Sequence, residues 1–123
     1  MTKQHSPRFL ALVEDAKQRV LQVTAAELKR KLEHEDHFHL IDVREEHEWN
    51  AGHVPRAQHL CKGILERDME TAVPDLNAEI ILYCGGGYRS ALAGDNLQKM
   101  GYTRVRSLAG GWRGWLEGGY LVE

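Results

Sequence analysis

The chain of 123 residues has little of what marks secreted, membrane-bound or nucleic-acid-binding proteins. Its charges nearly cancel, leaving a formal net charge of −2, so electrostatics gives no reason to expect nucleic acid or an anionic membrane as a partner. Only two cysteines are present, which is too few for the disulfide framework of a small secreted domain. We therefore expect Cys61 and Cys84 to be separate thiols and not a bridged pair.

Long hydrophobic runs are lacking as well. Near the N-terminus, the apolar stretch Phe9–Val13 is too short for the core of a secretory signal. No run approaches the ~20 apolar residues that a membrane-spanning helix needs. We therefore expect a cytoplasmic protein without a membrane partner. Nothing in the sequence indicates an oligomeric state.

What is present is the composition of an ordinary globular domain, with 42% hydrophobic and 28% charged residues. Helical spacing and start signals predict helices over residues 7–19, after the capping box Thr24–Glu27, and over 45–49, 64–69, about 88–100 and 112–116. Apolar runs predict strands around residue 23 and over 38–43, 58–60, 79–84 and 103–108.

This alternation of strands and helices predicts an α/β fold, a small and mainly parallel sheet with helices on both faces. We predict one domain over residues 23–123, preceded by an N-terminal helical extension over residues 1–22. In such sheets, sites form beyond the carboxyl ends of the strands. Asp42, Arg44 and Cys84 fall at such ends.

Cys84 is the most informative residue of the chain. It follows the apolar run Ile80–Tyr83 and precedes the loop Gly85–Arg89, after which a helical pattern begins. A helix N-terminus and nearby cations stabilise a thiolate, which is the nucleophilic form of cysteine. The glycines let successive backbone amides converge on one atom or anion. The sequence thus predicts a reactive cysteine.

Four segments of the chain, in this order, resemble the motifs of single-domain rhodaneses, the thiosulfate sulfurtransferase-like family. They are Leu40–Arg44, Gly52–Ala57, Cys84–Arg89 and Leu108–Trp112. Each motif is weak alone, but four in register make a chance similarity unexpected. The resemblance covers residues from about 23 to 116 and implies a rhodanese-like fold.

The resemblance also implies persulfide chemistry. The Cys84 thiolate would attack the outer sulfur of thiosulfate or another persulfide donor and become Cys84–S–SH. A thiophilic acceptor, such as cyanide in an assay or a protein or small thiol in a cell, would then take this sulfane sulfur. Neither a metal nor an organic cofactor is implied.

We expect the substrate to contact the loop that follows the cysteine. The expected substrate-binding residues are Gly85, Gly86, Gly87, Tyr88, Arg89 and Ser90. The backbone amides would cradle the anionic outer sulfur, and Tyr88 would flank the pocket mouth. Arg89 would either pair with an anionic donor or steady the loop. Ser90 is expected to be the N-cap of the helix, with contact to substrate as a second possibility.

Two alternatives to a sulfurtransferase are open. Cysteine phosphatases and arsenate reductases on this fold carry one more residue between Cys and Arg than the four found here between Cys84 and Arg89. The shorter loop suits a sulfur atom better than a tetrahedral oxyanion. The other alternative is a non-catalytic interaction module.

Thiosulfate-using relatives often have a basic residue directly after the cysteine, so Gly85 argues for a persulfide donor over thiosulfate.

Asp42 and Arg44 are expected to shape the pocket from behind, the alternative being a surface ion pair or a loop anchor. In the turn Gly52–Pro55 we interpret His53 as structural and not as a catalytic base, because a stabilised thiolate needs none.

Other side chains are given structural roles. Trp112 and Trp115 are predicted to pack in the core. The polar segment His34–His39 matches no metal-ligand spacing and is interpreted as a solvated connection. Cys61 is interpreted as a bystander, with a resolving thiol as the alternative.

Overall fold

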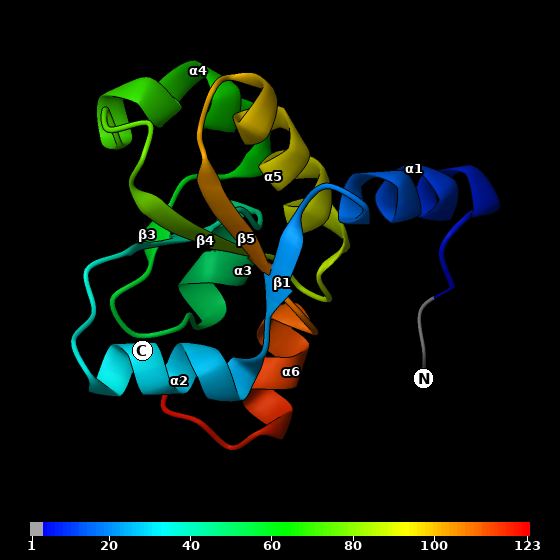
Figure 1. Cartoon of the computed structure of the whole chain (residues 1–123). Coiled ribbons are helices and arrows are strands. Elements are labelled where there is room, and N and C mark those ends of the chain that lie inside the picture. Colours follow the sequence, from blue (N-terminus) through cyan, green and yellow to red (C-terminus); the bar gives the residue numbers. More distant parts are fainter. Residues whose placement is uncertain (1–3) are drawn as a thin grey trace.

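Five parallel strands form the centre of the fold, in the order β1-β5-β4-β2-β3 (Figure 1). The computed structural model describes residues 4–123. The strands are β1 (Leu21–Val23), β2 (His39–Asp42), β3 (Gln58–His59), β4 (Glu79–Tyr83) and β5 (Arg104–Leu108). The predicted parallel α/β sheet is therefore confirmed, and each predicted strand is present within a residue or two of its expected bounds.

Helices cover both faces of this sheet (Figure 1). They are α1 (Pro7–Lys17), α2 (Ala25–Glu33), α3 (Glu46–Ala51), α4 (Lys62–Ala72), α5 (Tyr88–Lys99) and α6 (Gly111–Glu117). Helices α4 and α5 pack on one face, while α2 and α6 pack on the other. No helix among residues 4–123 has the length and apolar character needed to cross a membrane.

The central strand β4 sets the direction in which Cys84 points. Side chains alternate between the two faces of a strand. Ile80, Leu82 and Cys84 accordingly join the core under α4 and α5, whereas Ile81 and Tyr83 join the core under α2 and α6. Both faces are buried, which is why this strand is a continuous apolar run in the sequence. Cys84 is thus turned toward the start of α5.

Helix α1 packs on the outer side of α5. Val13 and Ala16 of α1 are buried against Ala91 of α5. An ion pair between Arg19 and Asp95, with an Nε–Oδ1 distance of 2.8 Å, closes the C-terminal end of this contact. The amphipathic face predicted for α1 is therefore buried on the domain. The division of the chain at residue 22 stays a prediction, and strand β1 spans it.

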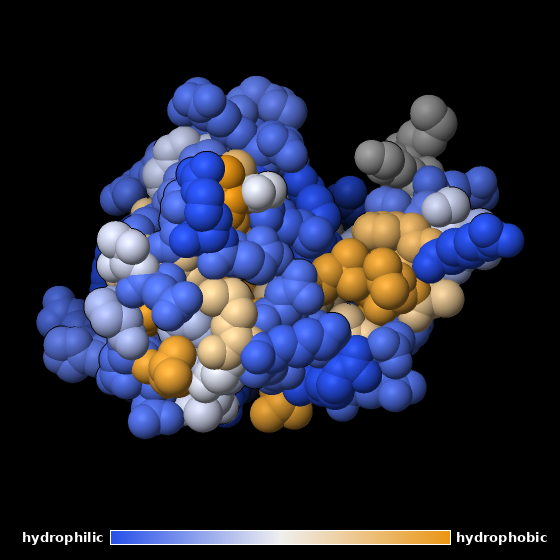
Figure 2. Space-filling model, turned by 90° about the horizontal axis from the view of Figure 1, so that it is seen from above, coloured by the Kyte–Doolittle hydropathy of each residue, from blue (hydrophilic) through white to orange (hydrophobic). Residues whose placement is uncertain are grey.

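The outward side of α1 is partly apolar. Leu10 is 36% exposed and Leu12 is 58% exposed. Figure 2 shows hydrophobic residues gathered on this side of the molecule. Neither side chain belongs to the buried cluster that packs α1 on α5.

Helix α6 begins at Gly111, one residue before its predicted start. Two other helix starts also differ from their predicted positions. Helix α4 begins at Lys62, two residues before the predicted start, because Cys61 takes the N-cap position although its side chain makes no capping bond. Helix α3 begins after Glu45 and is stabilised by a capping box between Glu45 and Glu48. Both starts use residues that are not common N-caps, so the sequence marks them weakly.

Candidate active site

Cys84 lies directly after the last residue of β4, at the carboxyl edge of the sheet, and is 1% exposed. Backbone amides of Gly87 and Ser90 donate hydrogen bonds to its Sγ, at 3.1 and 3.4 Å. The Sγ also lies 3.6 Å from the Ser90 hydroxyl, which shares a 2.7 Å hydrogen bond with Ser107. Two amide donors on one sulfur are an arrangement that favours an anionic sulfur.

The glycine at position 87 makes this loop possible. Gly87 is the N-cap of α5 and has a φ of +97°, a left-handed conformation in which a side chain is strained. The helix then begins at Tyr88, so its first-turn amides have no acceptor within the helix and face the sulfur. The prediction that Ser90 caps this helix is wrong. Ser90 lies inside the first turn, where its buried hydroxyl bonds to Ser107 on β5.

The start of α6 presses against the cysteine loop from the opposite side. The amide of Trp112 donates to the carbonyl oxygen of Cys84 at 2.7 Å, and the amide of Arg113 donates to that of Gly85 at 3.0 Å. Gly111 has a φ of +54°, and a Cβ at this position would collide with the Cys84 carbonyl oxygen. The absence of a side chain at Gly111 therefore lets α6 start directly against the cysteine loop.

Arg89 is bound to a carboxylate and does not project freely into the pocket. Its two terminal nitrogens contact the Glu48 oxygens at 2.9 and 3.1 Å. This hydrogen bonding, with the charge of Arg89, lowers the pKa of Glu48 to about 2. The same carboxylate raises the pKa of Arg89. Of the two roles predicted for Arg89, the geometry supports steadying the loop, which it ties to α3.

Asp42 and Arg44 form a buried ion pair behind the loop, so the surface alternative is wrong. They are 0% and 2% exposed, and their Oδ2 and Nη2 atoms lie 2.7 Å apart. The guanidinium also donates to the Gly52 carbonyl oxygen and lies 4.7 Å from the Trp112 ring. Burial lowers the pKa of Arg44, but the Asp42 carboxylate more than offsets this effect and the net shift is upward.

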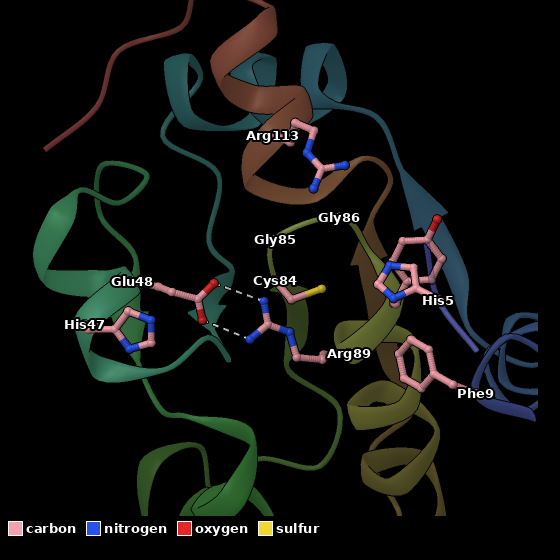
Figure 3. Close-up of a pocket in the computed structure, with 10 residues that line it drawn as sticks. His5, Phe9, His47, Glu48, Cys84, Gly85, Gly86, Arg89 and Arg113 are labelled. Atoms are coloured by element: carbon pink, nitrogen blue, oxygen red, sulfur yellow. Dashed lines mark hydrogen bonds and ion pairs between the residues drawn. The ribbon is translucent and has the colours of Figure 1, made fainter. Parts of the chain in front are cut away.

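A pocket of about 540 Å³ opens in front of Cys84 (Figure 3). Its walls come from the cysteine loop, α3, the start of α6 and the N-terminal segment. The lining residues are His5, Phe9, His47, Glu48, Cys84, Gly85, Gly86, Tyr88, Arg89 and Arg113.

The structure brings five of the predicted site residues to the surface of this pocket, namely Cys84, Gly85, Gly86, Tyr88 and Arg89. Gly87 and Ser90 lie behind the sulfur and contact it through their amides. Asp42 and Arg44 are not part of the pocket lining. The other half of the lining was missed, and only Glu48 carries a sequence signal, as the last residue of its capping box.

The remaining candidate residues have structural contacts. His53 stacks on Trp49 with ring centroids 3.5 Å apart and is absent from the pocket lining, as expected for a turn histidine. Trp115 is buried in the core as predicted. Trp112 is partly buried and packs against the same cluster. Cys61 and Cys84 are both free thiols.

Comparison with known proteins agrees with this geometry. Residues 24–118 match the family model of the rhodanese-like domain. The chain is 33% identical over 96 residues to the putative sulfurtransferase YtwF of Bacillus subtilis, covering 78% of this chain and 90% of that protein. It is 36% identical over 72 residues to the thiosulfate sulfurtransferase PspE of Escherichia coli, covering 58% and 69%.

The fold is shared over its whole length with a solved structure from Rhodopseudomonas palustris, a protein of unknown function described as a possible tyrosine phosphatase. The TM-score is 0.88 at 23% identity, and the match covers 100% of this chain and 99% of that one. At this identity the match bears on the fold alone, and it includes the N-terminal helix. From the family match and the relatives named as sulfurtransferases, the chain belongs to the rhodanese-like domain family.

Proposed function

We propose that the protein is a sulfurtransferase that carries sulfane sulfur as a persulfide on Cys84. The observation that carries this proposal is the pair of amides, from Gly87 and Ser90, that donate to Sγ at the floor of an open pocket. These donors favour the thiolate that starts the reaction and the thiolate that leaves at its end. Relatives named as sulfurtransferases support the same reaction class.

The reaction consists of two displacements. In the first, the Cys84 thiolate attacks the outer sulfur of the donor, the donor's S–S bond breaks, and the leaving group takes the bonding electrons. In the second, an acceptor attacks the outer sulfur of Cys84–S–S⁻ and the Cys84 thiolate leaves. No net oxidation occurs within the enzyme, and neither step calls for a metal or organic cofactor. The covalent intermediate predicts ping-pong kinetics.

The rest of the site positions this cysteine. We expect the backbone amides from Gly85 through Arg89 to cradle the outer sulfur of the persulfide. Arg89 holds the loop to α3 through Glu48. Arg44, fixed by Asp42, packs on the Trp112 ring, and the Trp112 amide binds the Cys84 carbonyl oxygen. The buried ion pair therefore acts through Trp112 on the position of the cysteine.

The charges of the site favour sulfur transfer over phosphate ester cleavage. A phosphatase needs its loop arginine directed at the phosphate oxygens. Here the guanidinium of Arg89 is bound by Glu48, whose carboxylate also lines the pocket and repels a dianion. The same repulsion acts on thiosulfate, so we propose a persulfide as the preferred donor. The acceptor is proposed to be a small-molecule or protein thiol.

Turnover assays test this function. With a persulfide or thiosulfate as donor and cyanide as acceptor, we expect thiocyanate from the wild-type protein and from Cys61→Ser, and none from Cys84→Ser. With an aryl phosphate, we expect no turnover. Hydrolysis of the aryl phosphate without any sulfur transfer would establish the phosphatase alternative. A lack of both activities would favour the non-catalytic interaction module.

A further inference from the structure

The N-terminal segment forms one wall of the Cys84 pocket. His5 and Phe9 contact Tyr88 of the cysteine loop, with ring centroids 4.5 Å apart for His5 and 6.1 Å apart for Phe9. His5 and Phe9 also contact each other at 5.2 Å. We call these three side chains the aromatic wall. The packing of Val13 and Ala16 on α5 holds the wall in place.

The other side of the pocket is polar. In Figure 3, His47 and Glu48 lie across Cys84 from His5 and Phe9, and Arg113 lies beyond Gly85 and Gly86. The charges of Glu48 and Arg89 compensate each other. Among residues 4–123, the guanidinium of Arg113 makes no ion pair. The pocket therefore offers the aromatic wall on one side of the sulfur and an uncompensated cation beyond Gly85 and Gly86.

The volume of the pocket exceeds what an inorganic donor needs. At about 540 Å³ it lies within the range of pockets that hold small organic ligands. Thiosulfate is a compact ion and would leave most of this space filled with water. It would also leave the aromatic wall without a partner. A substrate with an organic body uses both features.

Resting on the sulfurtransferase function proposed above, we propose that the pocket selects organic persulfides and thiols that carry an apolar body and one carboxylate. The body packs on His5, Phe9 and Tyr88, and the carboxylate pairs with Arg113. A donor R–S–SH, whose only charge is then its carboxylate, reacts with the Cys84 thiolate to give R–S⁻ and Cys84–S–SH, so sulfur, proton and charge balance. His5 and Phe9 are specificity-determining residues, and the N-terminal extension is part of the site.

Binding of a non-reacting analogue tests this selectivity directly. Amide NMR titration of the full chain compares 3-phenylpropanoate with propanoate, which lacks the ring, and with 3-phenylpropanol, which lacks the charge. We expect 3-phenylpropanoate to shift the amides of Gly85, Gly86 and Tyr88. It should bind about threefold to tenfold more tightly than either partial analogue. Equal affinity for the three compounds, or no binding of any, would overturn the proposal.

Matched variants test separately the contact of the ring with the aromatic wall and the contact of the carboxylate with Arg113. His5→Ala and Phe9→Ala should each reduce the preference for 3-phenylpropanoate over propanoate by about threefold to tenfold. Leu12→Ala, on the exposed side of the same helix, should not change it. His5 precedes α1, so its variant tests the wall even if Phe9→Ala loosens the helix. An unchanged preference in His5→Ala and Phe9→Ala would refute the proposal that the aromatic wall binds the apolar body of the substrate.

Arg113→Gln should remove most of the preference for 3-phenylpropanoate over 3-phenylpropanol, whereas Arg67→Gln, an exposed arginine on α4, should not. The rate at which a thiol bearing phenyl and carboxylate groups removes the outer sulfur from the persulfide form should follow the same order across the variants. If Cys84 accepts no sulfur but the binding preferences hold, the proposed function fails and the selectivity stands. If sulfur transfer proceeds equally with every thiol, the proposed selectivity is refuted and the proposed sulfurtransferase function stands.

Discussion

At the scale of single residues, the cysteine depends on backbone positions that only glycine can occupy. Gly111 combines a left-handed φ of +54° with a contact so close that a Cβ would overlap the backbone of Cys84 and Gly85. Helix α6 and the cysteine loop cannot both keep their places if a methyl group is added there. The sulfur's position is therefore linked to a residue outside its own loop.

We predict that Gly111→Ala destabilises the fold by about 2 kcal/mol or more, because the strained backbone and the collision act together. Gly63→Ala is the matched control, since a Cβ at this helical position meets nothing within 4 Å. It should change the stability by less than about 1 kcal/mol. Urea unfolding of the two variants measures the difference, and equal stabilities would contradict the close contact at α6.

The ion pair of Glu48 and Arg89 gives a second prediction, with a defined pH dependence. The pKa of Glu48 falls from an ordinary 4.5 to about 2 in the folded protein. A lowered carboxyl pKa adds stability that is fully present above pH 4.5 and is lost as the pH falls toward 2. Glu48→Gln should therefore cost about 1 kcal/mol at neutral pH, a value typical of a partly exposed pair.

The difference between wild type and Glu48→Gln should shrink between pH 4.5 and 2. Unfolding curves at a series of pH values measure it, with Glu46→Gln as a control on the exposed side of α3. A difference that stays constant down to pH 2 would show that the charge of Glu48 contributes nothing.

At the scale of elements, the packing of α1 shapes the pocket, and the sequence pattern of α1 does not predict this packing. Its helical spacing predicts an amphipathic helix, but the spacing does not say which surface covers the apolar face. The structure packs that face on α5, next to the loop that carries Cys84. This contact places His5 and Phe9 at the pocket.

We predict that Ala16→Glu releases α1, because Ala16 is 1% exposed and a carboxylate there would be buried without a partner. Hydrogen exchange of the amides in α1 should become about tenfold faster or more, while β4 keeps its protection. Ala11→Glu, on the exposed side of the same helix, should leave both unchanged. Slow exchange of α1 in Ala16→Glu would mean that the helix is held by other contacts.

The elements that the sequence predicted well are those with a local signal. The run Ile80–Tyr83 is apolar on both faces and identifies the central strand, and the glycines after Cys84 identify the loop. The residue type of Ser90 is a strong capping signal and predicts an N-cap, whereas the structure uses the backbone freedom of Gly87. Arg113 and the N-terminal contacts depend on packing between distant segments, which no local pattern encodes.

At the scale of the whole molecule, the order of strands explains why these distant residues meet. Strands β5, β4 and β2 are neighbours in the sheet, and their carboxyl ends lie at one edge. The segment after β2 supplies Glu48, the loop after β4 supplies Cys84, and the segment after β5 supplies Arg113. Parallel sheets bring sites together in this way. The N-terminal helix completes the pocket from outside the sheet.

Intact-mass analysis shows directly whether Cys84 takes up the transferred sulfur, as we propose. After exposure to an organic persulfide and removal of the excess donor, the wild-type protein should gain the mass of one sulfur atom. Added cyanide should remove that mass and release thiocyanate. Cys84→Ser should gain nothing, and Cys61→Ser should behave like the wild type. A sulfur adduct of equal yield on Cys84→Ser, or no adduct on the wild type with any donor, would contradict the account.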